Sequence, residues 1–431
     1  MDRRDSGPPS AGSRLTRPRL PLRMRGSAIR ALFLLLVAAA ALGVARAGKD
    51  LIERPSNSGG DQAVAANSAT VGDALFNRAA ATCRLTSATG RPPDINHSSS
   101  LVLGVHASLS LLSGRAQCEE ARLAKATGVQ AVREDLAWAD TEPRPNRYDW
   151  ATYDSVVKTA TEAGLAVLPV LDAAPAWAAQ TWNSVPSNPG PYAAFVAAAV
   201  KRYGPGGTFW RANPRLGTHP LVWYELWNEP YSGRNPDPKL YARLVRAAVT
   251  AARAVNASAR FLIEDTTVTV HGDRDDWIGE MYAAVPDLSR YFDGVALHPY
   301  GGNPTSPTPG AQPYAEPAAQ VQQAHSDLIA HGDGDKPLWV TEIGWSTCSG
   351  GTNCVTEAQQ ASYLRTFLTL SRTSWRSYLR AVMVYALRDF APARVDNREA
   401  WFGLIRPNLS HKPAWQVLRH ATTPTRSPEG A

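Results

Sequence analysis

At the centre of the chain lies Leu221-Val-Trp-Tyr-Glu-Leu-Trp-Asn-Glu-Pro230, an apolar and aromatic run that ends on a carboxylate. A second run, Leu338-Trp-Val-Thr-Glu-Ile-Gly-Trp345, repeats the pattern with Glu342 near its end. Burying an ionised carboxylate is costly unless the group is paired or its pKa shifts. Glu229 and Glu342 are therefore the first candidates for functional residues.

Around these runs, apolar stretches typical of buried strands alternate with longer segments of helical periodicity. We expect eight strands, at Leu101–His106, Val129–Glu134, Leu165–Asp172, Leu221–Glu229, Arg260–Asp265, Gly294–His298, Leu338–Glu342 and Ala381–Leu387. Strands that alternate with helices favour parallel βα units. Eight such units predict an α/β fold, a single (β/α)8 TIM barrel.

The expected helices carry recognisable start and stop signals. Tyr153, Val156, Val157 and Ala160 follow the spacing of one helix face, and Gly164 ends that helix before the next strand. Thr356-Glu-Ala-Gln359 is a capping-box pattern that opens another helix.

The first 47 residues differ from the rest of the chain. Their nine arginines and two aspartates account for the whole net charge of +7. The remaining chain is close to neutral, so binding to nucleic acid has no electrostatic support. The Arg-rich part precedes an apolar run, Ala31–Val44, and the small-residue site Ala45-Arg-Ala47, which together predict an export signal. An uncleaved membrane anchor through residues 29–47 is the alternative, and would be the only membrane contact.

The sequence divides into four parts on this basis. We expect a signal or anchor at residues 1–47, a polar linker or N-terminal arm at 48–100 with a short helix at Ala74–Ala81, the barrel at 101–420, and a C-terminal tail at 421–431. We expect a secreted monomer.

Four cysteines, an even number, suit an oxidising compartment. Cys348 and Cys354 bracket a Gly-rich loop after the second carboxylate run and could close it as a disulfide, which leaves Cys83 and Cys118 to pair with each other. Four free thiols are the alternative, which export disfavours. No Cys-x-x-Cys or His-Glu-x-x-His occurs, so we expect no metal and no cofactor.

Polar residues gather where the predicted strands end. In such a barrel these ends meet at one face and form the active site. The residues expected there are His106, Arg133, Glu134, Asp135, Asp172, Asn228, Glu229, Asp265, His298, Tyr300, Glu342, Tyr385, Arg388 and Asp389. Glu225 lies within its strand, and we expect it to fill the barrel interior paired with a cation.

A facing pair of carboxyl groups is what glycoside hydrolysis requires. One carboxyl must carry a proton for the leaving oxygen, and the other must stay ionised to attack the anomeric carbon. The neutral neighbours of Glu229 favour the acid role. Arg133 and Tyr300 are the expected donors to Glu342, which would keep it charged.

Three strings together resemble the clan A glycoside hydrolases, which are retaining (β/α)8 enzymes. They are Trp227-Asn-Glu-Pro230, Thr341-Glu-Ile-Gly-Trp345 and His298-Pro-Tyr300, and the resemblance spans roughly residues 101–420. The segment from Val132 to Trp150 is similar to the second barrel unit of families 5 and 39. The resemblance implies Glu229 as acid/base, Glu342 as nucleophile, Asn228 at the sugar 2-hydroxyl, Arg133 and Tyr300 orienting the nucleophile, and His298 lining the subsite of cleavage.

Two positions depart from the clan pattern and leave the sugar open. Tyr385 stands where many members have a tryptophan platform, and Asp172 stands where family 5 has a histidine. These departures favour family 39 or an unclassified relative. Tryptophans that fall in strand-end loops could stack on sugar rings, and we expect two or three to do so among Trp138, Trp177, Trp182, Trp345 and Trp401. His106 either lines the sugar site or packs under the first loop.

The expected function is therefore an exported retaining β-glycosidase acting on a polysaccharide or oligosaccharide. One alternative is a transglycosylase that remodels a cell-wall or capsular polysaccharide through the same covalent intermediate. The other is a carbohydrate-binding barrel that has lost its catalytic activity.

Overall fold

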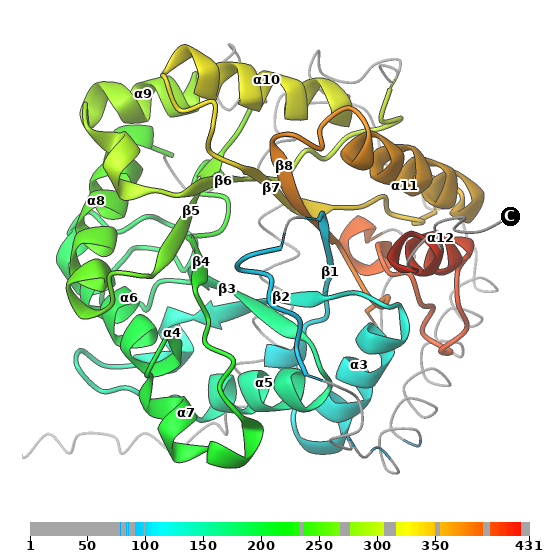
Figure 1. Ribbon diagram of the computed structural model, residues 1–431, viewed down its shortest axis with the longest axis horizontal. Coiled ribbons are helices and arrows are strands. Elements are labelled where there is room, and N and C mark those ends of the chain that lie inside the picture. Colours follow the sequence, from blue (N-terminus) through cyan, green and yellow to red (C-terminus); the bar gives the residue numbers. More distant parts are fainter. Residues whose placement is uncertain are drawn as a thin grey trace, which may run out of the picture.

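The structure is a computed structural model that describes residues 78, 83, 85, 91–98, 100–232, 236–267, 276–305, 316–349, 354–390 and 397–423. Eight parallel strands form a closed barrel in sequence order, with β1 paired to β8. Figure 1 shows the strands at the centre with the helices arranged around them. The predicted (β/α)8 barrel is confirmed.

The strands lie close to their predicted positions. Their bounds are β1 (Val102–His106), β2 (Ala131–Ala137), β3 (Ala166–Asp172), β4 (Trp223–Leu226), β5 (Arg260–Asp265), β6 (Gly294–Leu297), β7 (Leu338–Ile343) and β8 (Leu379–Val384). The main correction concerns β4, which ends before Glu229 rather than at it. Trp227 and Glu229 have φ values of 73° and 46°, and these left-handed conformations cannot continue a strand.

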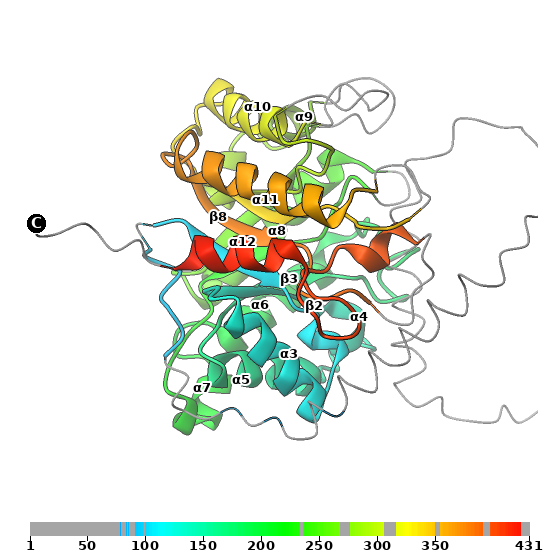
Figure 2. The ribbon, with the colours of Figure 1, turned by 90° about the vertical axis from the view of Figure 1, so that its right-hand side faces the viewer.

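Helices cover the outside of the barrel. Their bounds are α3 (Gly114–Ala126), α4 (Trp138–Thr141), α5 (Ala151–Glu162), α6 (Pro189–Tyr203), α7 (Thr208–Ala212), α8 (Pro238–Val255), α9 (Trp277–Ala284), α10 (Pro317–Ala330), α11 (Glu357–Arg372) and α12 (Pro413–Thr422). Both Figure 1 and Figure 2 show α11 beside α12. The predicted capping box at Thr356 opens α11, and Gly164 follows α5 with a φ of 71° that favours glycine.

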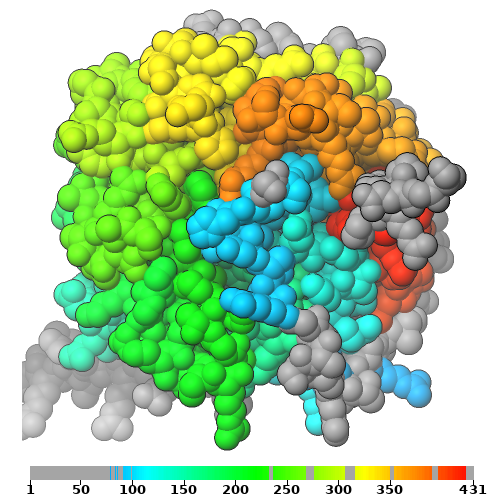
Figure 3. Space-filling view, viewed as in Figure 1, coloured from blue at the N-terminus to red at the C-terminus, as the bar shows by residue number. Residues whose placement is uncertain are grey.

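The barrel interior begins with an apolar layer near the N-terminal ends of the strands. It contains Val102, Ala131, Leu168, Trp223, Leu262, Ala296, Trp339, Ala381 and Met383, with Ile95 packed against them. The segment 91–98 closes this end, and Arg380 Nη2 donates to the carbonyl oxygens of Ile95 and Asn96 at 3.0 and 2.5 Å. Figure 3 shows the N-terminal part of the described chain, in blue, against green and orange parts.

A hollow of about 1480 Å3 lies at the same end of the barrel. Its lining includes residues 91–97, Pro220–Trp223, Arg260, Pro337 and Arg380, which stand at the starts of strands or before them. Active sites of this fold lie at the opposite, C-terminal ends of the strands. This hollow is therefore separate from the predicted site.

Both expected disulfides are present. Cys83 is bonded to Cys118 of α3, and Cys348 is bonded to Cys354. The predicted signal or anchor, most of the arm at 48–100 and the end of the tail lie outside the described residues. Of the short helix expected at Ala74–Ala81, only Arg78 is described, and it is helical. Among the residues that the structure describes, no helix is long and apolar enough to cross a membrane.

Candidate active site

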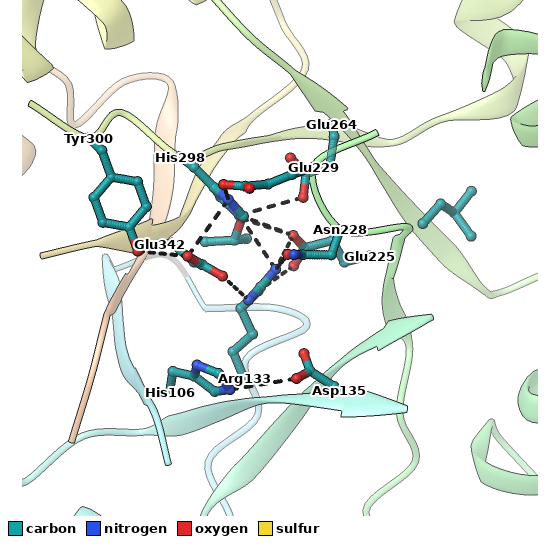
Figure 4. A network of polar contacts seen from close by, with 12 residues as sticks. His106, Arg133, Asp135, Glu225, Asn228, Glu229, Glu264, His298, Tyr300 and Glu342 are labelled. Carbon is teal, nitrogen blue, oxygen red and sulfur yellow. Dashed lines mark hydrogen bonds and ion pairs between the residues drawn. The ribbon is translucent and has the colours of Figure 1, made fainter. Parts of the chain in front are cut away.

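A polar layer follows the apolar layer of the barrel interior, and Figure 4 shows its members Arg133, Glu225, Glu264 and His298 close together. It contains Arg133 on β2, Glu225 on β4, Glu264 on β5, His298 after β6 and Thr341 on β7. Each of these residues follows a member of the apolar layer by two positions. Since side chains alternate along a strand, all five point into the barrel, one layer nearer its C-terminal end.

Arg133 binds several of the polar side chains around it. Its guanidinium binds both oxygens of Glu225, each at 2.9 Å, and Nη1 donates to Oε1 of Glu342 at 2.6 Å. Nη2 also donates to Oδ1 of Asn228 at 2.8 Å. The predicted contact with Glu342 and the predicted cation partner of Glu225 are thus both present. A buried planar guanidinium holds several acceptors in one fixed arrangement.

Glu342 accepts a second hydrogen bond, from the hydroxyl of Tyr300 at 2.7 Å. Burial by itself would raise the pKa of Glu342, but the positive charges of His298 and Arg133, together with this hydrogen bond, hold the pKa below its usual value. The carboxylate therefore stays ionised around neutral pH.

An irregularity in β7 explains why two successive residues reach the interior. Val340 pairs with Val382 and Ile343 with Val384, so β7 has one residue more than β8 over this stretch. Thr341 and Glu342 lie in this bulge. Such bulges redirect side chains and are frequent beside active sites.

Glu229 lies on the loop after β4, and Oε1 is 3.1 Å from Nδ1 of His298. The same nitrogen lies 3.8 Å from Oε2 of Glu342. Carboxylate oxygens of Glu229 and Glu342 come within 4.8 Å of each other, and Figure 4 shows both groups beside His298. The side chain of Glu229 is 28% exposed and that of Glu342 is 11% exposed. Two carboxyl groups in different environments thus lie side by side.

A second group of polar side chains comes from the first three strands and the end of β8. Nε2 of His106 lies 4.0 Å from Oδ2 of Asp135, and the ring of His106 packs against that of Tyr385 at 5.1 Å. The Tyr385 ring also meets Tyr300 edge-on. Burial lowers the pKa of His106 and raises the pKa of Asp172 well above its usual value. Tyr385 thus packs against both His106 and Tyr300, and Tyr300 in turn binds Glu342.

Two tryptophans predicted to bind sugar lie elsewhere. Trp138 is fully buried and stacks on Phe195, and its Nε1 donates to Glu142 at 2.7 Å. Trp345 is 3% exposed and packs against Tyr363 and Phe367 of α11. Neither ring leaves a face for a sugar, so both belong to the core. The other three candidates, Trp177, Trp182 and Trp401, are partly exposed.

Several polar residues expected at the strand ends form contacts with segments outside the barrel. Glu134 follows Arg133 and faces the helices, where Oε2 accepts from the backbone of Ser110 at 3.2 Å. Arg388 pairs with Glu120 at 3.0 Å. Asp389 pairs with Lys412 at 2.8 Å. These contacts hold the barrel to its surrounding segments.

Glu264 and Thr341 were not predicted as site residues. In β5 the expected site residue was Asp265 at the strand end, but the strand pleat places Glu264 in the interior and Asp265 on the other side. The pattern that predicted an interior position for Glu225 also fits Glu264. Each is a carboxyl residue within an apolar strand, two residues after an interior side chain.

Two groups of side chains have the composition of a metal site. They are Glu225, Glu264 and His298, and Glu229, His298 and Glu342, with one atom from each within 4.8 Å of the others. We assign no metal to either group. Arg133 already brings a positive charge against Glu225 and Glu342, and His298 is engaged with Glu229 and Thr341.

Comparison with known proteins gives one family match. The model of the family described as Cellulase (glycosyl hydrolase family 5) matches residues 110–379. No curated protein matches the chain significantly.

Similar solved structures come from two families. A family 39 glycoside hydrolase from Bacteroides cellulosilyticus superposes with a TM-score of 0.54 at 22% identity, over 75% of this chain and 64% of that one. A monomeric β-xylosidase from Caulobacter crescentus gives 0.54 at 19% identity, over 77% and 69%. A family 5, subfamily 18 protein from Bifidobacterium longum, in complex with Manβ1-4GlcNAc, gives 0.53 at 15% identity, over 75% and 78%. The chain thus spans less than two thirds of the first structure, and at these identities the likeness concerns the fold.

Proposed function

Because the chain belongs to the cellulase family, glycosyl hydrolase family 5, we propose that it is an exported retaining β-glycosidase in which Glu342 is the nucleophile and Glu229 the general acid/base. One observation carries this proposal. The two carboxyl groups approach within 4.8 Å at the C-terminal ends of the strands. Retaining enzymes hold this pair about 5–5.5 Å apart, whereas inverting enzymes leave about 6.5–9.5 Å for a water molecule.

The two carboxyl groups have different environments, although Glu229 lies against His298 and not only against the neutral groups expected from the sequence. Arg133 and Tyr300 hold Glu342 ionised with fixed orientation, which suits attack on an anomeric carbon. Glu229 is more exposed, so it can reach the oxygen of a leaving group. The carbonyl oxygen of Asn228 faces Arg133, and its amide nitrogen is the end that can donate to a sugar hydroxyl.

The reaction then follows double displacement. Glu342 attacks the anomeric carbon and forms a glycosyl ester, while Glu229 gives its proton to the departing oxygen. Glu229 next removes a proton from water, and the resulting attack releases the sugar with its configuration retained. Hydrogen bonds from Asn228 to the sugar would strengthen as the transition state develops.

The polar group formed by His106, Asp135, Asp172 and Tyr385 would bind the hydroxyls of the sugar next to Glu342. The partly exposed Trp177, Trp182 and Trp401 are the aromatic candidates for stacking on a sugar ring. Oδ1 of Asp172 and Nδ1 of His106 are buried and have no hydrogen-bond partner in the described part of the chain, so a ligand hydroxyl could supply one. The two disulfides support an exported protein acting on a polysaccharide or oligosaccharide outside the cytoplasm.

The test is hydrolysis of a panel of aryl β-glycosides and β-linked polysaccharides, with the anomer of the first product read by NMR. We expect retention, and a 2-fluoro glycoside of the preferred sugar should label Glu342. An inverted product would contradict the mechanism. Products longer than the substrate at high acceptor concentration would indicate the transglycosylase. Binding with neither turnover nor label would indicate the inactive barrel.

A further inference from the structure

Glu264 is a buried carboxyl group that the proposed reaction leaves without a task. Its side chain is fully buried in β5, and neither oxygen has a hydrogen-bond partner among the described residues. Oε1 lies 3.5 Å from Nε2 of His298. Burial, reinforced by the nearby Glu225, raises the pKa of Glu264 well above its usual value, and the positive charge of His298 acts against this shift. An ionised carboxylate in this position needs such a positive charge to balance it. His298 is the group placed to carry that charge.

The hydrogen bonds around Nε2 of His298 require a proton on that nitrogen. Its oxygen neighbours are Oγ1 of Thr341 at 3.1 Å, Oε1 of Glu264 at 3.5 Å and Oε1 of Glu225 at 3.6 Å. The hydroxyl of Thr341 donates to Glu225, and Nη2 of Arg133 directs its hydrogens to Glu225 and Asn228. An unprotonated Nε2 would therefore depend on one long contact, with Nη2 of Arg133 at 3.4 Å.

The other ring nitrogen also faces acceptors. Nδ1 lies 3.1 Å from Oε1 of Glu229 and 3.8 Å from Oε2 of Glu342. The charged groups facing His298 are thus one guanidinium and the carboxyl groups of Glu225, Glu229, Glu264 and Glu342. Burial by itself lowers the pKa of His298, but the carboxylates, that of Glu264 first among them, raise it well above its usual value.

We propose that Glu264 is a positioning residue that keeps His298 doubly protonated, so that Nδ1 always presents a proton to Glu229. This rests on the proposed role of Glu229. The imidazolium would hold that carboxyl group beside Glu342 and stabilise the negative charge that remains after the leaving oxygen has been protonated. Glu264 itself would not touch the substrate.

The experiment is an NMR titration of the full chain labelled with 15N-histidine, between pH 5 and 8. The His298 signal is assigned by its loss in His298→Asn. In the wild type we expect both ring nitrogens to stay protonated over the whole range. In Glu264→Gln the balancing charge is lost, and His298 should titrate within the range. Glu264→Asp keeps the charge and should behave like the wild type.

Glu134→Gln is the matched control, because it removes a buried glutamate from the helix-facing side of β2. It should leave the His298 signal unchanged. Thermal melting verifies that each variant is folded. In Glu264→Gln, kcat/KM should acquire an ionisation between pH 5 and 8 that the wild type lacks, and should fall about tenfold above it.

A His298 that titrates near its ordinary pKa in the wild type would overturn the proposal, as would one that stays charged in Glu264→Gln. The titration needs no substrate, so it is independent of the proposed function. The expected titration without turnover of any glycoside would contradict that function while supporting the pairing of Glu264 with His298.

Discussion

Glu342 and Glu229 carry the same carboxyl group but differ in their hydrogen bonds and in their exposure to solvent. Glu342 has two strong donors and little contact with solvent, whereas Glu229 has one contact with His298 and is more exposed. Its positive φ places Glu229 in a backbone conformation that is costly for residues other than glycine. Such conformations are maintained by the surrounding structure and concentrate at functional sites.

The proposed acid role of Glu229 predicts a dependence on the leaving group. In Glu229→Gln we expect kcat/KM to fall by about 100- to 10,000-fold on a substrate whose leaving oxygen needs a proton. The loss should be much smaller on a dinitrophenyl glycoside of the same sugar, because that phenolate departs without protonation. Equal losses on both substrates in steady-state assays would contradict the assignment.

Tyr300→Phe tests the charge on Glu342 through pH dependence. The hydrogen bond from Tyr300 contributes to the lowered pKa of Glu342. Without it that pKa rises, so a larger fraction of Glu342 is protonated and inactive at low pH. The acid limb of kcat/KM should move to higher pH by about one unit. An unchanged acid limb in a folded variant would show that the bond does not control the charge of Glu342.

Glu134→Gln should change how stability depends on pH. Burial raises the pKa of Glu134 to about 8 from 4.5. Between these values the folded state holds a proton that the unfolded state has released, so this group makes stability fall as pH rises, by up to about 1.4 kcal/mol per unit. Urea unfolding at pH 5 to 8 should show a shallower fall for the variant. Parallel curves for the two proteins would contradict this.

At the scale of elements, the loops that follow β8 are held by a buried ion pair. Nζ of Lys412 bonds Oδ1 of Asp389 and Oγ1 of Thr347, both at 2.8 Å, and the backbone of Gly403 donates to the same oxygen of Asp389. Gly403 has no room for a side chain, because a Cβ would lie 2.1 Å from the backbone nitrogen of Asp389. The pair thus joins β8, the segment before α12 and the loop after β7.

Lys412→Met should be strongly destabilising. It leaves the carboxyl group of Asp389 buried without its cation, and breaking a buried pair in this way costs about 3 kcal/mol or more. Urea unfolding measures the loss. Adding Asp389→Asn should restore most of it, since the uncompensated charge is then gone. If Lys412→Met alone were as stable as the wild type, the ion pair would contribute little to the stability of the folded state.

At the scale of the whole molecule, the two disulfides close loops of very different length. The cysteines of the first pair are 35 residues apart and those of the second are 6 apart. A cross-link stabilises the folded state mainly by restricting the unfolded chain, and more so for the longer loop. The first bond also ties the described N-terminal part of the chain to α3.

Replacing both cysteines of each pair by serine should therefore give unequal losses of stability. Loop closure predicts about 4 kcal/mol for Cys83 with Cys118 and about 2 kcal/mol for Cys348 with Cys354. Unfolding in guanidinium chloride compares the two double variants with the wild type. The reverse order would show that native contacts around the short loop outweigh the entropy of the chain.

The sequence by itself predicted the features that depend only on a short stretch of the chain. Eight apolar runs, their intervening helices and the capping box at Thr356 are patterns within short windows, and all appear in the structure. The strings around Glu229 and Glu342 likewise identified the two carboxyl groups that meet. A charge at the end of an apolar run is visible without knowing its partners.

Only the tertiary structure decided which residues lie beside the two carboxyl groups. Glu264 rather than Asp265 points inward, the bulge in β7 brings Thr341 in together with Glu342, and Trp138 and Trp345 lie in the core. The direction of a side chain depends on the register of adjacent strands, and its burial depends on the helices that cover it. Neither is a property of the residue's own segment, because both are fixed by contacts between parts far apart in the chain.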